Sequence, residues 1–260
     1  MKSERRRATR SRWSAAVACA PTLVLLTSCT GISKDDDASV AFTQPSDGAE
    51  VAGGVDLLMT ADGITIEEAG EVHDDAGHFH VVADDGCVAE GEAVPRDADH
   101  VHFGAGQSEG TIYLEPGEHE LCLQAGDGAH VALEPTDTVT VTVGIDSLDE
   151  WCAVAREADE RFEAIDNGDD DFPARQLAYE GQRRLLAQLS AGLDQVDADA
   201  RNDVADSIDT GTAIVTTFIA AADFESAGAA LEEQFGIEGI QSDQPGAVWI
   251  TDNCDVDIDG

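Results

Sequence analysis

The stretch TVTVTVGIDSLDEWCAVAREADERFEAI, residues 138–165, contains the change of pattern that decides the fold. Its first six residues alternate Thr and Val, so Val139, Val141 and Val143 point to one face, as in a half-buried strand. From Ser147 onward, apolar residues recur three or four positions apart, which is the period of a helix. The switch predicts a β part over residues 39–145 and a helical part over residues 146–260.

The β part consists of short apolar runs separated by turn sequences such as Pro-Gly, Asp-Gly and Gly-Asp. About seven strands in about 105 residues are typical of an immunoglobulin-like antiparallel β-sandwich. The predicted strands cover residues 40–43, 55–60, 78–83, 101–103, 111–114, 120–124 and 138–143.

The spacing of apolar residues in the helical part predicts a small bundle of three or four antiparallel helices joined by short loops. Pro173 suits the first turn of the second helix, and a shorter helix is expected over residues 225–235. Trp249 and Ile250 in the acidic tail are expected to pack against the bundle. The fold class predicted for the whole chain is α+β in two domains.

The first 28 residues have the features of a signal peptide. A cationic start is followed by an apolar run over residues 14–26, which is shorter than the about 20 residues that span a bilayer. The sequence Leu26-Thr27-Ser28-Cys29 resembles a lipobox, in which cleavage precedes a lipid-modified cysteine. This predicts a protein anchored through Cys29 to the outer face of the cell membrane, with residues 29–38 as a tether. Ordinary secretion is the alternative, and the export route stays open.

The cysteines are consistent with export. Besides Cys19 in the leader and Cys29, four cysteines remain, an even set that suits an oxidising compartment. Of the three possible pairings, the division into two domains favours Cys87–Cys122 and Cys152–Cys254. A four-thiolate metal site is the rival, but the sequence has no CxxC pair.

The charge of the chain is strongly negative. There are 14 Lys and Arg residues against 54 Asp and Glu residues, a net charge of −40. Six of the 14 lie in the first twelve positions, so eight basic residues face 53 acidic ones after residue 28, and the net charge there is −45. This composition excludes a general nucleic-acid binder, which needs a basic footprint. An acidic surface poor in lysine also predicts adaptation to high salt, where self-repulsion is screened.

All seven histidines lie between His73 and His130. Two His-x-His pairs fall on predicted strands, and residues i and i+2 of a strand share a face, so each pair presents two imidazoles side by side. Imidazole is a frequent ligand of zinc and copper, and the surrounding acidity attracts cations. The sequence therefore predicts a transition-metal or polar-ligand site. Its candidate ligands are His78, His80, His100, His102, His119, Asp127 and His130.

A family resemblance rests on five segments in order. They are Pro45-Ser46-Asp47-Gly48-Ala49, Gly77-His78-Phe79-His80, His102-Phe103-Gly104-Ala105-Gly106-Gln107-Ser108-Glu109, Pro116-Gly117-Glu118-His119 and Gly126-Asp127-Gly128-Ala129-His130. Over residues 40–144 the chain thereby resembles the domain-of-unknown-function family 4399. That family often has three consecutive histidines where this chain has Phe79, so a site that uses the middle histidine would be altered. The resemblance implies the domain and singles out its histidines, but it implies no chemistry.

Three functions are compatible with these patterns. The favoured one is a lipid-anchored, extracytoplasmic module that binds zinc or copper through the histidines, with the membrane and a protein of the cell envelope as partners. The alternative is a non-catalytic cell-envelope interaction protein whose histidines are structural. An enzyme is the least favoured, because the sequence has no HExxH motif and no recognisable general base.

Overall fold

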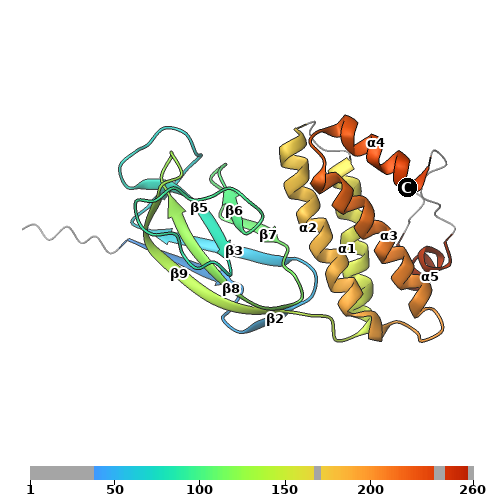
Figure 1. Ribbon diagram of the computed structural model, residues 1–260. Coiled ribbons are helices and arrows are strands. Elements are labelled where there is room, and N and C mark those ends of the chain that lie inside the picture. Colours follow the sequence, from blue (N-terminus) through green and yellow to red (C-terminus); the bar gives the residue numbers. More distant parts are fainter. Residues whose placement is uncertain (1–37, 167–170, 237–243, 257–260) are drawn as a thin grey trace, which may run out of the picture. The chain divides into compact units, whose positions relative to one another are not determined.

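The computed structural model of the 260-residue chain describes residues 38–166, 171–236 and 244–256. Within these ranges nine strands come first and five α-helices follow, so the fold class is α+β, as predicted (Figure 1). No helix in the described ranges combines the length and apolar character needed to cross a membrane. The predicted signal peptide, Cys29 and residues 29–37 of the predicted tether lie outside the described residues.

The strands form two sheets. The smaller sheet has the order β1 (Ser39–Gln44), β3 (Val55–Asp62), β7 (Glu109–Ile112). The larger has the order β2 (Ala49–Val51), β9 (Ala132–Val143), β8 (Gly117–Gly126), β5 (Ala76–Ala83), β4 (Thr65–Ile66), and β6 (His100–Phe103) also pairs with β5.

The sheets are antiparallel except at two short pairs. β2 runs parallel to β9, and β4 runs parallel to β5. The sequence analysis predicted antiparallel pairing throughout. Parallel neighbours need a long connection instead of a tight turn, and β2 and β9 are separated in sequence by the rest of the sandwich, which supplies one.

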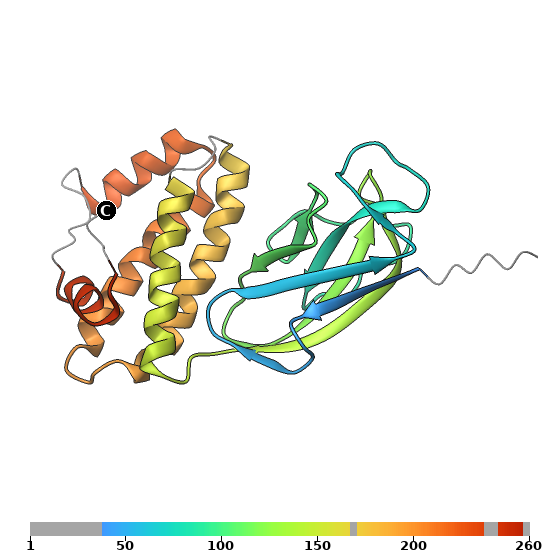
Figure 2. The ribbon, with the colours of Figure 1, turned by 180° about the vertical axis from the view of Figure 1, so that it is seen from behind.

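The hydrophobic core lies between the two sheets, which face each other in Figures 1 and 2. Val55, Leu57 and Met59 of β3 are buried while the residues between them are exposed, as the period of a strand requires. Val141 and Val143 of β9 are buried in the same core. Each such side chain stabilises the sandwich by about 1.5–3 kcal/mol.

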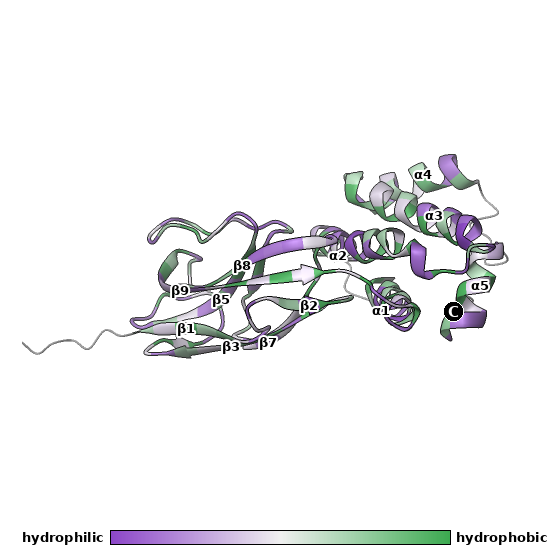
Figure 3. Cartoon of the chain, turned by 90° about the horizontal axis from the view of Figure 1, so that it is seen from below, coloured by the Kyte–Doolittle hydropathy of each residue, from purple (hydrophilic) through white to green (hydrophobic). Residues whose placement is uncertain are grey.

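Five α-helices follow the sandwich, one or two more than predicted. The additional helix is α5, which the sequence analysis treated only as a packed tail. Its ten residues begin with Pro-Gly, which obscures a helical period. Hydrophobic and hydrophilic residues are interspersed along the helices in Figure 3, as the apolar period predicts. The helices are α1 (Leu148–Asp166), α2 (Phe172–Ala191), the 3-10 helix η1 (Leu193–Gln195), α3 (Arg201–Ala220), α4 (Phe224–Phe235) and α5 (Pro245–Cys254).

Local chemistry explains where two of the helices begin. Asp223 and Ser226 form a capping box at the start of α4, since each side chain bonds the backbone N–H of the other residue. Pro173 lies in the first turn of α2, where its missing N–H has no cost.

The helices have a hydrophobic core of their own. Trp151 is fully buried in it, and its indole N–H donates to the carbonyl of Leu189 at 3.0 Å.

Buried polar side chains of α2 bind the backbone of the sandwich. Gln188 accepts a hydrogen bond from the N–H of Gly53 at 2.8 Å and donates to the carbonyls of Gly53 and Leu114. The described residues, from 38 onward, belong to a single compact unit. The buried side-chain amide of Gln188 holds α2 to the sandwich within this unit, because breaking its hydrogen bonds would leave polar groups unsatisfied.

Two disulfides are present, Cys87–Cys122 and Cys152–Cys254, which confirms the predicted pairing. The second joins α1 to the last residue of α5. Paired cysteines indicate an oxidising, extracytoplasmic environment.

Candidate metal centre

The candidate site is built on β5, whose eight residues are all buried. Phe79 and Val81 point into the core between the sheets, and His78 and His80 point to the opposite face. In the larger sheet His80 is directly opposite His102 of β6 on one side and Gln124 of β8 on the other. The alternation predicted from the His-x-His pattern is therefore present, and the strand register brings a third histidine beside the first two.

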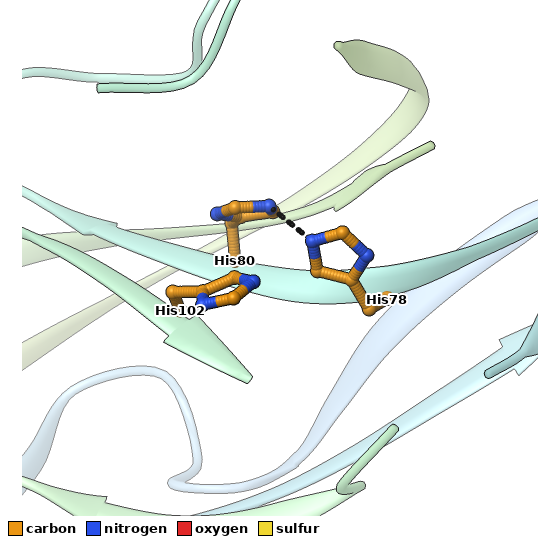
Figure 4. A group of neighbouring side chains, drawn as sticks. All are labelled: His78, His80 and His102. Carbon is orange, nitrogen blue, oxygen red and sulfur yellow. Dashed lines mark hydrogen bonds between the residues drawn. The ribbon is translucent and has the colours of Figure 1, made fainter. Parts of the chain in front are cut away.

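Four imidazoles form one cluster, consisting of His78, His80, His102 and His130. All six distances between their ring centroids fall between 4.7 and 5.9 Å. The Nε2 atoms of His78 and His80 are 2.9 Å apart, and those of His102 and His130 are 3.1 Å apart. Figure 4 shows His78 and His80 on one strand with His102 on its neighbour, their rings turned toward one another.

The fourth histidine reaches the cluster from a turn. One carboxylate oxygen of Asp127 accepts hydrogen bonds from the backbone N–H groups of Ala129 and Val131, at 2.8 and 3.0 Å. His130 within this turn has φ of 64°, a left-handed conformation that non-glycine residues seldom adopt. Asp127 was predicted as a metal ligand, and the structure gives it a positioning role, since it holds the turn that carries His130.

Two glycines leave room for the rings. A Cβ at Gly104 would collide with the ring of His102, and a Cβ at Gly126 would lie 2.8 Å from Nε2 of His80. Neither glycine has the positive φ that would otherwise call for glycine. We infer that the space occupied by the imidazoles explains glycine at both positions.

Covering segments bury this face of the sheet. Gln124 holds the loop after β5 by bonding both the N–H and the carbonyl of Val88, and the Cys87–Cys122 disulfide fixes the same loop. A second loop, which follows β4, is joined to the turn that carries His130, because the N–H of Gly70 donates to the carbonyl of Gly128 at 2.9 Å. His78 is consequently 0% exposed and His80 1% exposed. Neither histidine therefore lies on a hydrated face of the sheet.

Burial and the neighbouring charged groups lower the pKa of three of the clustered histidines. Burial, and then the neighbouring histidines, lower the pKa of His78 to about 4 and the pKa of His80 to about 3. The pKa of His102 is also lowered, first by burial and then by His130 and Arg96. Neutral imidazole is the form that binds a metal ion, so these three side chains are ready to coordinate at neutral pH.

The geometry fits a transition-metal ion. One nitrogen from each of His78, His80 and His102 lies within 4.8 Å of the corresponding atoms of the other two. Tetrahedral zinc with bonds of 2.0–2.1 Å separates its nitrogen ligands by about 3.3 Å. The His78–His80 and His102–His130 contacts of 2.9 and 3.1 Å would open by a few tenths of an ångström to admit it. The wider separations in the triad, up to 4.8 Å, would have to shorten toward the same value.

The structure separates two of the predicted ligands from the cluster. Nδ1 of His119 is 2.7 Å from a carboxylate oxygen of Asp84, and its Nε2 is 2.7 Å from the carbonyl oxygen of Glu115. His119 lies two residues before Leu121 on β8, so it belongs to the core face of that strand. Nδ1 of His100 is 2.8 Å from the carboxylate of Asp97. These two side chains have protein partners of their own.

Sequence reasoning missed three features of the site. His119 and Leu121 are two residues apart on one strand, so the sequence could have placed His119 on the same face as the apolar Leu121, but this spacing was overlooked. Gly104 and Gly126 were noted only as parts of family segments. Arg96, whose charge acts on His102, carried no pattern in the sequence.

Comparison with known proteins gives a family match over part of the chain but no chemistry. Residues 57–144 match the family described as "Domain of unknown function (DUF4399)". This match supports the resemblance seen in the sequence and covers His78, His80, His102 and His130. No curated protein matches the chain.

Two solved structures are similar over part of the chain. The first is described as "Structures of Clostridium thermocellum CbhA fibronectin(III)-like modules", with 19% identity, a TM-score of 0.25, and coverage of 40% of this chain and 95% of that one. The second is an endo-beta-1,4-mannanase from Thermotoga petrophila, with 14% identity, a TM-score of 0.27, and coverage of 44% of this chain and 21% of that one. At scores this low, neither structure bears on the chemistry of this chain.

Proposed function

We propose that the β-sandwich binds one transition-metal ion, zinc or copper, through His78, His80 and His102, with His130 as the fourth ligand. The observation that carries the proposal is the burial of His78 and His80 against each other. Their Nδ1 atoms are buried and have no hydrogen-bond partner among the described residues. An unsatisfied buried polar atom costs about 1–3 kcal/mol, and packing alone leaves that cost in place. A metal ion would supply a partner to whichever ring nitrogen coordinates it, Nδ1 or Nε2.

Four protein nitrogens would complete a tetrahedral shell, which is typical of sites that hold a metal and not of sites that activate water. We therefore propose a binding module, not an enzyme. A bound ion would replace the ring-to-ring Nε2 contacts of the cluster by metal–nitrogen bonds.

The alternative is a non-catalytic cell-envelope interaction protein with structural histidines. His100 and His119 favour it, because each pairs with a carboxylate inside the fold. His78 and His80 have no such partner among the described residues, which is why metal binding is the better proposal for the cluster.

Calorimetric titration with zinc and with copper(II) tests the proposal, on protein purified without an affinity tag and in excess magnesium to occupy the acidic surface. We expect one tight site per chain, lost in the His78→Ala, His80→Ala double variant. The matched control is His73→Ala, His119→Ala, which also removes two histidines but leaves the cluster intact. Equal loss in both variants, or no binding tighter than the micromolar range, would refute the metal site.

We further propose that the protein is exported, anchored through lipid on Cys29, and adapted to high salt. The disulfides and the acidic composition support this setting. Incorporation of labelled lipid that is lost in Cys29→Ala tests the anchor. A melting temperature that rises with sodium chloride tests the adaptation, and one that is unchanged or falls would contradict it.

A further inference from the structure

A cleft of about 250 Å³ lies beside the histidine cluster. Strands β6 and β7 and helices α1 and α2 contribute to its lining. His102 lines the cleft as well as belonging to the cluster. Its other lining residues include Arg96, Tyr113, Arg161, Glu180 and Arg184.

The cleft concentrates positive charge in a very acidic protein. Only eight Lys and Arg residues follow residue 28, and three of them, Arg96, Arg161 and Arg184, line this one cleft. The guanidinium of Arg161 lies over the ring of Tyr113, 4.1 Å from its centroid, which holds it at the wall.

The three arginines of the cleft have N–H groups without a hydrogen-bond acceptor among the described residues. Arg184 is buried and donates to the carbonyls of Ala98 and Tyr113, and it pairs with Asp99, yet its Nε is buried without an acceptor among the described residues. Arg161 donates from Nη2 to the carbonyl of Ala178 at 2.9 Å, and its Nε is likewise buried without an acceptor among the described residues. Arg96 is exposed and has no hydrogen bond or ion pair within the described part of the chain.

The carboxylates of the lining already have partners. Asp97 accepts hydrogen bonds from the N–H groups of Asp99 and His100 and contacts the His100 ring. Glu180 pairs with Arg183, Nε to oxygen, at 2.9 Å. The free donors of Arg96 and Arg161 are therefore not neutralised by these acids.

We propose that this cleft binds a small oxyanion, a carboxylate or a phosphate group carried on a molecule of a few carbon atoms. Guanidinium groups recognise both through paired N–H···O bonds. The volume lies below the 300–1,000 Å³ range of pockets for drug-sized ligands, which limits the ligand to a small one. The acidic surface repels anions at low salt, and concentrated salt screens that repulsion. This inference goes beyond the metal site and does not depend on it.

Calorimetric titration at constant ionic strength tests the cleft, with succinate in one arm and inorganic phosphate in the other. We expect saturable binding of at least one anion with one site per chain. The Arg96→Gln, Arg161→Gln variant should bind at least tenfold more weakly. The matched control is Arg156→Gln, Arg201→Gln, which removes two arginines that also donate to backbone carbonyls but lie outside the cleft.

The proposal would be overturned by no saturable binding of either anion, by equal weakening in the control, or by retained binding in the Arg96→Gln, Arg161→Gln variant. If that variant fails to fold, Arg96→Gln alone serves, because Arg96 is exposed. Repeating the titration without metal and in His78→Ala, His80→Ala separates the two sites. Binding that persists there supports the cleft even if the metal site fails, whereas binding lost there would place the anion on the metal.

Discussion

Phe79 and Val81 on one face of β5 are completely buried, and His78 and His80 on its other face are buried to the same degree, with exposed fractions of 0–1%. The first pair packs into the core between the sheets, where burial of apolar area is itself stabilising. The second pair buries imidazoles whose Nδ1 atoms have no partner within the described residues. Equal burial therefore has opposite energetic effects on the two faces. Burial of Phe79 and Val81 stabilises the fold, whereas burial of His78 and His80 costs stability and places the candidate metal ligands together.

The largest expected effect separates the two faces by stability. Phe79→Ala should lower the free energy of unfolding by about 3–5 kcal/mol, because it leaves a cavity in the core. His80→Leu should change the metal-free value by less than about 1 kcal/mol, because it removes an unsatisfied polar ring and fills similar space. Denaturant titration at fixed high salt and neutral pH measures both. A loss as large in His80→Leu as in Phe79→Ala would make the histidine face part of the core.

The second effect is the stabilisation by zinc, which should depend on the histidine face and not on the core face. Zinc at a hundredfold excess over its dissociation constant should stabilise the wild type by about 2.7 kcal/mol, because it binds only the folded state. Phe79→Ala should keep this increment, and His80→Leu should lose most of it. Unfolding with zinc and with a chelator provides the measurement. An increment that survives in His80→Leu would mean that zinc binds elsewhere.

A smaller effect concerns the glycines. Gly104→Ala should weaken zinc binding about tenfold, or about 1.4 kcal/mol, because the new Cβ displaces the ring of His102. Gly144→Ala is the matched control, since a Cβ there meets nothing within 4 Å. Calorimetry on both variants tests the role, and equal affinities would show that the cluster tolerates a shifted ring.

The last effect concerns the dependence of stability on pH without metal, which shows as a small change for each fraction of a pH unit. The pKa values of His78 and His80 are lowered to about 4 and about 3 in the folded protein, from 6.5. Between pH 6.5 and those values the unfolded chain binds protons that the folded chain does not, so stability falls as the pH falls through this window. The slope should stay below the about 2.7 kcal/mol per pH unit that two fully coupled protons would give.

Acid also protonates carboxylates, so the wild type must be compared with His78→Leu, His80→Leu. The difference between the two melting curves should grow as the pH falls from 6.5 toward 4. Parallel curves would show that the buried rings do not resist protonation.

Much of the fold follows from local sequence. The alternation over residues 138–143 and the helical period after Ser147 predict the two kinds of structure, because each depends on neighbours in the same segment. Those signals weaken in short elements, and α5, β2 and β4 were missed for that reason.

The sequence by itself determined that His78 and His80 share a face, since residues i and i+2 of any strand do so. It also determined an even set of cysteines after Cys29 and the excess of acidic residues. Only the tertiary structure decided that His102 and His130 join that pair, that His119 belongs to the core face of β8, and that three arginines line one cleft. The physical reason is that a strand's own period fixes the direction of its side chains, whereas strand register and loop closure depend on contacts between residues far apart in the chain.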